Sequence, residues 1–250
     1  MKKSSAFGLS SSIAAFVLLA SSGPARADAA GDAFLAKVDS AVNRAKTLTL
    51  DYEIVHTEPG KAERALRATV LHKGDKRVFE FNAPADMKGT KMLILSPTEM
   101  YSYLPSFGKV RRVASHTSDQ GFMGLVFNEG DIATTAYGSE YSATVASEDA
   151  KTSRLVLTPK TGKTTPYAKI EITVQKDKNL PSEIKYFGAD GKNAKTETRT
   201  NYACKGDVCV AGEVKMTDNT KGTWTKFVVK VRNMNTAIED DVFSKRSLEK

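Results

Sequence analysis

Cys204 and Cys209 are the two cysteines of the chain, and four residues, Lys-Gly-Asp-Val, separate them. Two thiols this close in sequence favour a local disulfide across a turn in an oxidising compartment, although the spacing leaves open a redox-active pair. A zinc site would need two further ligands. The remaining candidate ligands are three histidines that lie far apart in the sequence: His56, His72 and His116. We therefore expect a structural disulfide, no metal and no cofactor.

Two neighbouring arginines and two tyrosines are the other polar candidates. Arg111 and Arg112 are adjacent in a strand-like segment, so their side chains point to opposite faces. One faces solvent, and the other is placed to bind a phosphate or a carboxylate such as Asp131. The alternative for both is a surface or structural salt bridge. Tyr101 and Tyr103 share one face, where we expect them at the polar rim of a cavity or in purely structural packing.

Catalytic patterns are absent from the sequence. The serines lack convincing histidine and acid partners, and no G-x-S-x-G motif occurs. The consecutive acids Glu239-Asp240-Asp241 are typical of a turn and helix cap. Basic clusters are not interleaved with aromatic residues, which argues against nucleic-acid binding. We expect a protein that is not an enzyme and does not bind nucleic acid.

The elements that must position these residues are mostly strands. Residues 31–46 carry apolar side chains at helical spacing and predict one amphipathic helix. After residue 47 the period changes to two, with frequent turns such as residues 73–76, which predicts an antiparallel meander. Residues 115–137 interrupt it and hold a short helix beginning near Glu129. The expected fold is mainly β (α+β): about eleven strands in one large curved sheet, capped by an N-terminal helix and a short helical lid.

A sheet of this size has more apolar surface than two helical segments cover, which predicts a partly open, concave apolar face and a lipid-binding function. Gly121 and Gly124 flank Phe122-Met123 and would let a lid open. An ordinary dry core is the alternative for all the candidate lipid contacts. These candidates are apolar residues of the strands and of the lid: Phe79, Phe81, Met92, Ile94, Met100, Leu104, Phe122, Met123, Leu125 and Phe127.

The N-terminal segment predicts where the protein works. Residues 1–27 combine Lys2 and Lys3, an apolar run over 13–20, and the small-x-small pattern Ala25-Arg26-Ala27, as in a cleaved secretory signal peptide. The apolar run is too short to span a bilayer. We expect residues 28–250 to form one exported, soluble domain, most simply in a bacterial periplasm, away from ATP, NAD and chromosomal DNA. The formal charge of +8 falls to +5 when Lys2, Lys3 and Arg26 leave with the signal peptide, and this moderately basic surface suits anionic lipid headgroups or acidic proteins, or serves only solubility.

Several motifs together resemble the outer-membrane lipoprotein-sorting protein family, the LolA-like periplasmic proteins. The resemblance spans nearly all of residues 28–250, and its motifs lie at 101–105, 108–112, 121–124, 129–132 and 238–246. It implies an unclosed, strongly bent antiparallel half-barrel whose cavity accepts acyl chains. It also implies an association with transporters of the resistance-nodulation-division (RND) type, or with an outer-membrane acceptor.

The leading hypothesis is therefore a periplasmic carrier that binds lipid or lipoprotein acyl chains and shuttles them toward the outer membrane, touching membranes transiently. The alternative is a non-carrying accessory or sensor domain that docks on an RND-type transporter.

Overall fold

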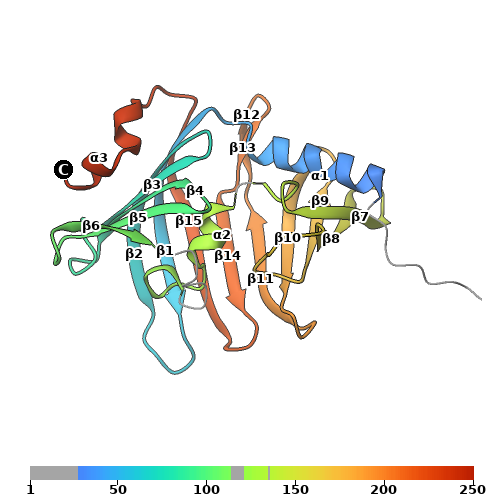
Figure 1. The fold of residues 1–250 in the computed structure, drawn as a ribbon, viewed down its shortest axis with the longest axis horizontal. Helices are drawn as coiled ribbons and strands as arrows, with labels where there is room; N and C mark the ends of the chain where they lie inside the picture. Colours follow the sequence, from blue (N-terminus) through green and yellow to red (C-terminus); the bar gives the residue numbers. More distant parts are fainter. Residues whose placement is uncertain (1–27, 114–120, 135) are drawn as a thin grey trace, which may run out of the picture.

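The computed structural model describes residues 28–113, 121–134 and 136–250, and these form one open antiparallel sheet of 13 strands (Figure 1). The predicted signal peptide, residues 1–27, and His116 lie outside the described residues. The strand order is β6-β5-β4-β3-β2-β1-β15-β14-β11-β10-β9-β8-β7. The strands are β1 Thr47–Thr57, β2 Arg64–Lys73, β3 Lys76–Ala83, β4 Lys91–Ser96, β5 Glu99–Leu104, β6 Lys109–Val113, β7 Tyr141–Glu148, β8 Thr152–Pro159, β9 Lys169–Gln175, β10 Leu180–Phe187, β11 Asn193–Thr200, β14 Glu213–Asp218 and β15 Thr223–Met234.

A separate two-stranded hairpin, β12 Ala203–Lys205 and β13 Val208–Val210, accompanies this sheet. The helical segments of the described chain are α1 Ala29–Val42, η1 Phe122–Gly124, α2 Glu129–Ala133, η2 Asp240–Phe243 and α3 Lys245–Leu248. The predicted N-terminal helix, the turn at residues 73–76 and the short helix near Glu129 are confirmed.

The expected strand number and curvature are corrected by the structure. The described sheet has 13 strands rather than about eleven, and it is open and not strongly curled. The chain also breaks after β11 and before β14, at the same level, and the β12–β13 hairpin between these breaks lies outside the large sheet. Asn201 has φ +55°, and Gly212 donates its N–H to the carbonyl of Asn201, where a Cβ on residue 212 would collide with that carbonyl. These two residues end β11 and separate β13 from β14.

Helix α1 lies across the β7–β10 end of the sheet (Figure 1). Asp28 caps its first turn by accepting a hydrogen bond from Ala30 N–H, and Asn43 caps its C-terminus. Its apolar stripe buries Leu35 and Val38 in the core. Gly31 allows the close approach to β7, because a Cβ there would lie 2.3 Å from the carbonyl oxygen of Ala143. The helix therefore covers only one half of the sheet.

The sheet is apolar on both faces, but over different areas. The inner face, under α1 and α2, carries the main core, which runs from β5 across to β7. The outer face of β2–β6 carries a second cluster, in which Phe243 and Leu248 pack on Val78, Leu93 and Tyr101. The chain after β15 thus covers the outer face with η2 and α3, and the Glu239-Asp240-Asp241 run begins η2, where Asp240 forms an ion pair with Lys73 at 3.1 Å.

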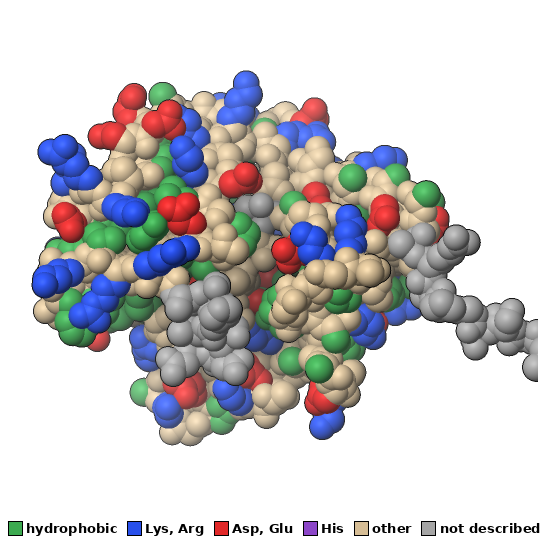
Figure 2. Space-filling model, in the orientation of Figure 1, with side chains coloured by type: hydrophobic (Ala, Val, Ile, Leu, Met, Phe, Trp, Pro, Cys, Tyr) green, Lys and Arg blue, Asp and Glu red, His purple; other side chains and the backbone are tan. Residues whose placement is uncertain are grey.

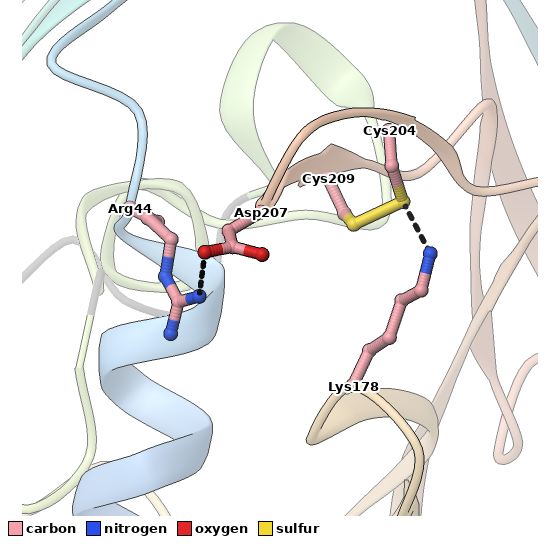
Figure 3. Close-up of a disulfide and its surroundings, with 5 residues drawn as sticks. All are labelled: Arg44, Lys178, Cys204, Asp207 and Cys209. Carbon is pink, nitrogen blue, oxygen red and sulfur yellow. Dashed lines mark hydrogen bonds and ion pairs between the residues drawn. A yellow bond between two sulfur atoms is a disulfide. The ribbon is translucent and has the colours of Figure 1, made fainter.

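The β12–β13 hairpin is closed by the predicted disulfide between Cys204 and Cys209, which the structure confirms (Figure 3). Lys178 Nζ donates to Cys204 Sγ at 3.3 Å, and Arg44 at the end of α1 forms an ion pair with Asp207 in the turn at 3.7 Å. Cys209 packs on Ala41 of α1 and Leu180 of β10. The hairpin therefore ties the end of α1 to the sheet.

Replacing both cysteines with serine is expected to lower the free energy of unfolding by about 2 kcal/mol, because reopening so short a loop restores its entropy to the unfolded chain. Urea unfolding of the variant and of the reduced wild type measures this loss. The matched control is Lys178→Met, which removes the exposed contact to Sγ and should change stability by less than about 0.5 kcal/mol. Equal stability of the double variant and the wild type would contradict the prediction.

Candidate functional site: a lidded cavity

A cavity with a volume of about 250 Å³ lies between the inner face of the sheet, the C-terminal half of α1, helix α2 and the β12–β13 hairpin. Its lining comes from strands that are distant in sequence, from β1–β3 on one side to β9–β11 on the other. The apolar part of the lining includes Leu50, Val70, Phe79, Ile184, Val214 and Phe227. Side chains of the described residues leave this space open, and its volume approaches that of small-molecule sites, which begin near about 300 Å³.

The wall formed by β11 is charged rather than apolar. Lys195, Glu197 and Arg199 alternate along the strand and face inward. Glu197 is 3% exposed, accepts a hydrogen bond from Tyr186 Oη at 3.1 Å, and is paired with Arg199 Nε. Burial opposes the charge on Arg199, but Glu197 together with the tyrosines around it outweighs burial and raises the pKa of Arg199. These ionic side chains are thus paired within the wall.

Helix α2 forms the lid, and Asp131 fastens it to β11. Asn128 and Asp131 form a reciprocal capping box at the start of the helix. The Asp131 carboxylate, whose side chain is 2% exposed, also accepts hydrogen bonds from Tyr167 Oη at 2.6 Å and Lys195 Nζ at 2.7 Å. A helix of five residues has little stability of its own, so these contacts hold it in place.

Two more contacts hold the lid from the other sides. Arg77 of β3 donates from Nη1 to the carbonyl oxygen of Ile132. Asp39 of α1 accepts from the backbone N–H groups of Tyr137 at 3.1 Å and Gly138 at 2.9 Å. Burial raises the pKa of Asp39, while these hydrogen bonds oppose the shift. Polar contacts therefore fasten helix α2 to β3 and β11, and the chain just after it to α1.

The structure separates the predicted lipid contacts into two groups. Phe79 and Phe127 line the cavity. Most of the others lie in the inner-face core and are at most 3% exposed: Phe81, Met92, Ile94, Met100, Phe122 and Leu125. Met123 packs on that core while partly buried, and Leu104 is partly buried at the end of β5. Contact of these side chains with a lipid stays a prediction.

The segment between Gly121 and Gly124, which we expect to open as a lid, is closely packed in the structure, and its opening stays a prediction. Phe122 donates its N–H to the carbonyl of Phe127 at 2.7 Å, and a Cβ on residue 121 would overlap the carbonyl of Leu125. Gly121 is therefore needed for close packing of the turn. Gly121, Gly124 and Leu125 border a second, more polar cleft of about 600 Å³.

The predicted polar rim is also placed differently. Tyr101 and Tyr103 do share a face, but it is the outer one, under η2 and α3, and Tyr101 Oη donates to Glu99 at 2.9 Å. Arg111 and Arg112 are exposed on the edge strand β6, where Arg111 lies 4.5 Å over the Phe107 ring. The suggested pairing of either arginine with Asp131 is wrong, because Asp131 is paired with Lys195.

Sequence reasoning missed the polar residues that face the cavity. His72 continues the inward alternation of Leu66, Ala68 and Val70, and this pattern was the available signal for a histidine facing the cavity. Strand β11 has no apolar alternation, so nothing in the sequence marked Glu197 or Arg199 as inward. Within the described chain, no group of three His, Cys, Asp or Glu side chains is placed to hold a metal ion.

Lowering the pH from 7 to 5 is expected to destabilise the fold by about 2 kcal/mol through His72. Burial, assisted by the positive charge of Arg77, lowers the pKa of His72 to about 4. Between pH 6.5 and pH 4, His72 is protonated in the unfolded chain, where its pKa is the ordinary 6.5, but stays neutral in the folded chain. This stability is therefore fully present above pH 6.5 and is lost as the pH falls toward 4.

Urea unfolding at pH 7 and pH 5 tests this, with His72→Gln expected to lose most of the pH dependence. His56 is also buried, and its pKa is lowered by burial and by Arg64, so His56→Gln should remove a further part with the same sign. An unchanged pH dependence in the double variant would show that other groups are responsible.

Comparison with known structures fits this architecture. The fold matches a putative outer membrane lipoprotein-sorting protein domain from Vibrio parahaemolyticus with a TM-score of 0.78 and 22% identity over 88% of this chain and 99% of that one. A DUF1329 family protein from Desulfovibrio piger matches with a TM-score of 0.78 and 21% identity over 88% and 98%. A LolA superfamily protein from Nitrosomonas europaea matches with a TM-score of 0.71 and 19% identity over 87% and 98%. The fold is therefore LolA-like.

A family model described as an uncharacterized protein matches residues 73–250, more than half of the chain. The chain belongs to that family. The predicted resemblance to the LolA-like, lipoprotein-sorting group is confirmed at the level of the fold. No curated protein sequence matches the chain significantly. Among the described residues of this LolA-like chain, no helix is long and apolar enough to cross a membrane.

Proposed function

We propose that the protein is a periplasmic carrier that binds acyl chains of lipids or lipoproteins in the lidded cavity and moves them toward the outer membrane. The observation that carries the proposal is the unfilled cavity of about 250 Å³ over an apolar floor. The LolA-like fold and the disulfide support a lipid-related role outside the cytoplasm. The predicted signal peptide, residues 1–27, would place residues 28–250 there.

The energetics suit reversible binding. Each methylene buried from water contributes about 0.8 kcal/mol, so an acyl chain against Leu50, Val70 and Phe227 is held through an aqueous compartment. Helix α2 must move for the chain to enter, and it is held by polar contacts to Lys195 and Arg77, while Asp39 holds the residues that follow it. Binding and release therefore depend on opening of the lid.

A pair of tryptophan variants tests the carrier. Val214 lines the cavity, and Val214→Trp fills it. Val228, one strand away, pairs with Glu53 on the outer face, so Val228→Trp is the matched control. We expect acyl probes and co-purifying lipids, followed by native mass spectrometry, to be lost in the first variant and retained in the second. Absence of bound lipid and of probe binding in the wild type would refute the carrier function.

A second candidate function is an accessory domain that docks on an RND-type transporter. The exposed edge strand β6 favours it, because Lys109, Arg111 and Arg112 are exposed there and Phe107 beside it is 55% exposed. Lys and Arg side chains are prominent over this end of the molecule (Figure 2). Crosslinking in whole envelopes, from single cysteines on β6 and on the distant exposed turn at Lys192, would capture a transporter only from β6 if this function holds.

A further inference from the structure

Arg77 is a cation in the cavity wall that has no anionic partner among the described residues. Its side chain is partly buried, lines the cavity and donates to the carbonyl of Ile132. No carboxylate of the described residues lies within ion-pair distance of it, and the acid whose charge acts on it, Asp75, is exposed. Burial lowers its pKa to about 10, so the guanidinium remains charged at neutral pH.

The carboxylates that line the same cavity are committed to other groups. Asp39 accepts from the backbone N–H groups of Tyr137 and Gly138, Asp131 is paired with Lys195, and Glu197 is paired with Arg199. Guanidinium has five N–H donors, of which Arg77 uses one on a neutral carbonyl. Removing a cation from water costs free energy unless an anion pairs with it.

Two neighbouring side chains leave polar atoms free beside Arg77. His72 is 7% exposed and lines the cavity, and within the described residues neither ring nitrogen has a hydrogen-bond partner of ordinary geometry, although the backbone of Gly74 lies close enough to affect it. The hydroxyl of Tyr52, which also lines the cavity, makes no hydrogen bond to another described residue. Buried polar atoms are ordinarily paired, so the two buried nitrogens of His72 indicate a missing ligand, and the Tyr52 hydroxyl, which reaches the cavity, is placed to donate to it.

We propose that Arg77, Tyr52 and His72 bind the anionic oxygen group, a carboxylate or a phosphate, of an amphiphile whose acyl chain lies on the apolar floor. The inference rests on the proposed carrier function and adds the chemical class of the cargo. Arg77 provides charged, two-pronged donors to the oxygens, and Tyr52 adds a third donor. Phe79 and Val70, next to Arg77 and His72 along β3 and β2, begin the apolar floor.

Calorimetric titration of the delipidated full-length mature protein tests the proposal with three ligands below their micelle concentrations. Dodecanoate carries the anion, while dodecanol and methyl dodecanoate carry the same chain without charge. We expect dodecanoate to bind at least 10-fold more tightly than either neutral ligand. Arg77→Met should abolish this preference while leaving the affinity for dodecanol within twofold of wild type, and Arg77→Lys should retain part of it.

Further variants and ligands distinguish failure of the anion site from failure of the carrier function. Tyr52→Phe, a smaller change, should reduce the preference, whereas Arg112→Met on β6 should not alter it. Equal affinities of the wild type for all three ligands would overturn the anion site but uphold the carrier. Binding of none of them would overturn both. Tight binding of inorganic phosphate alone, undiminished by a chain-bearing competitor, would overturn the amphiphile in favour of a free anion.

Discussion

Replacing Asp131 with alanine is expected to lower the free energy of unfolding by about 3 kcal/mol, because it leaves the largely buried Lys195 ammonium without its partner. The change also removes the acceptor of Tyr167 Oη and half of the capping box of α2. Since five residues cannot hold a helix alone, the lid should detach from β11. Urea unfolding measures the loss of stability, and hydrogen exchange at 129–134 measures the freeing of the lid.

Two further variants serve as comparisons for Asp131→Ala. Asp131→Asn keeps an acceptor for Tyr167 but loses the charge, so its loss of stability should be intermediate. Asp190→Ala removes an exposed carboxylate whose ion pair with Lys192, at 3.7 Å, lies on the surface and should cost less than about 1 kcal/mol. Similar small losses for Asp131→Ala and Asp190→Ala would mean that Asp131 does not fasten the lid.

Phe122→Ala is expected to lower the free energy of unfolding by about 3 to 5 kcal/mol. The Phe122 ring is 1% exposed and packs on Phe79 and Phe81 with centroid distances of 5.9 and 5.8 Å. Removing it leaves a cavity that the rigid turn at Gly121 cannot collapse into. Because Phe122 lies outside the lining of the lidded cavity, the affinity of the folded variant for acyl probes should change by less than about twofold.

Met123→Ala is the matched control, since Met123 is the next residue and only partly buried. Its loss of stability should stay within about 1 kcal/mol. Chemical unfolding gives the first quantity, and fluorescence titration of an acyl probe gives the second. A large loss of acyl affinity in Phe122→Ala, with stability intact, would instead place Phe122 in contact with the cargo.

The mainly β fold followed from local patterns. Alternation such as Leu66, Ala68 and Val70 marks a strand with one buried face, and the helical stripe of Leu35 and Val38 marks α1. These signals are local, because each depends on how a single element meets a core. The disulfide could be predicted for the same reason, since its two cysteines lie across one short turn.

The site depended on long-range pairing, which a single sequence does not show. Apolar alternation marked Phe81, Met92 and Phe122 as inward but did not distinguish a packed core from the lining of a cavity. That distinction depends on which side chains from distant strands fill the same space. Arg199 and Arg77 meet the same cavity from β11 and β3, which lie on opposite sides of the central strands.

The sequence by itself determined the class of fold, the disulfide and the positions of the two helical covers, because periodicity and short-range spacing suffice for each. Only the tertiary structure decided which apolar residues are core, which face Tyr101 occupies, and that Asp131 belongs to Lys195 rather than to an arginine of β6. The physical reason is that burial and ion pairing are properties of the assembled sheet. Each strand presents two faces, and segments that are distant in the sequence determine what each face contacts.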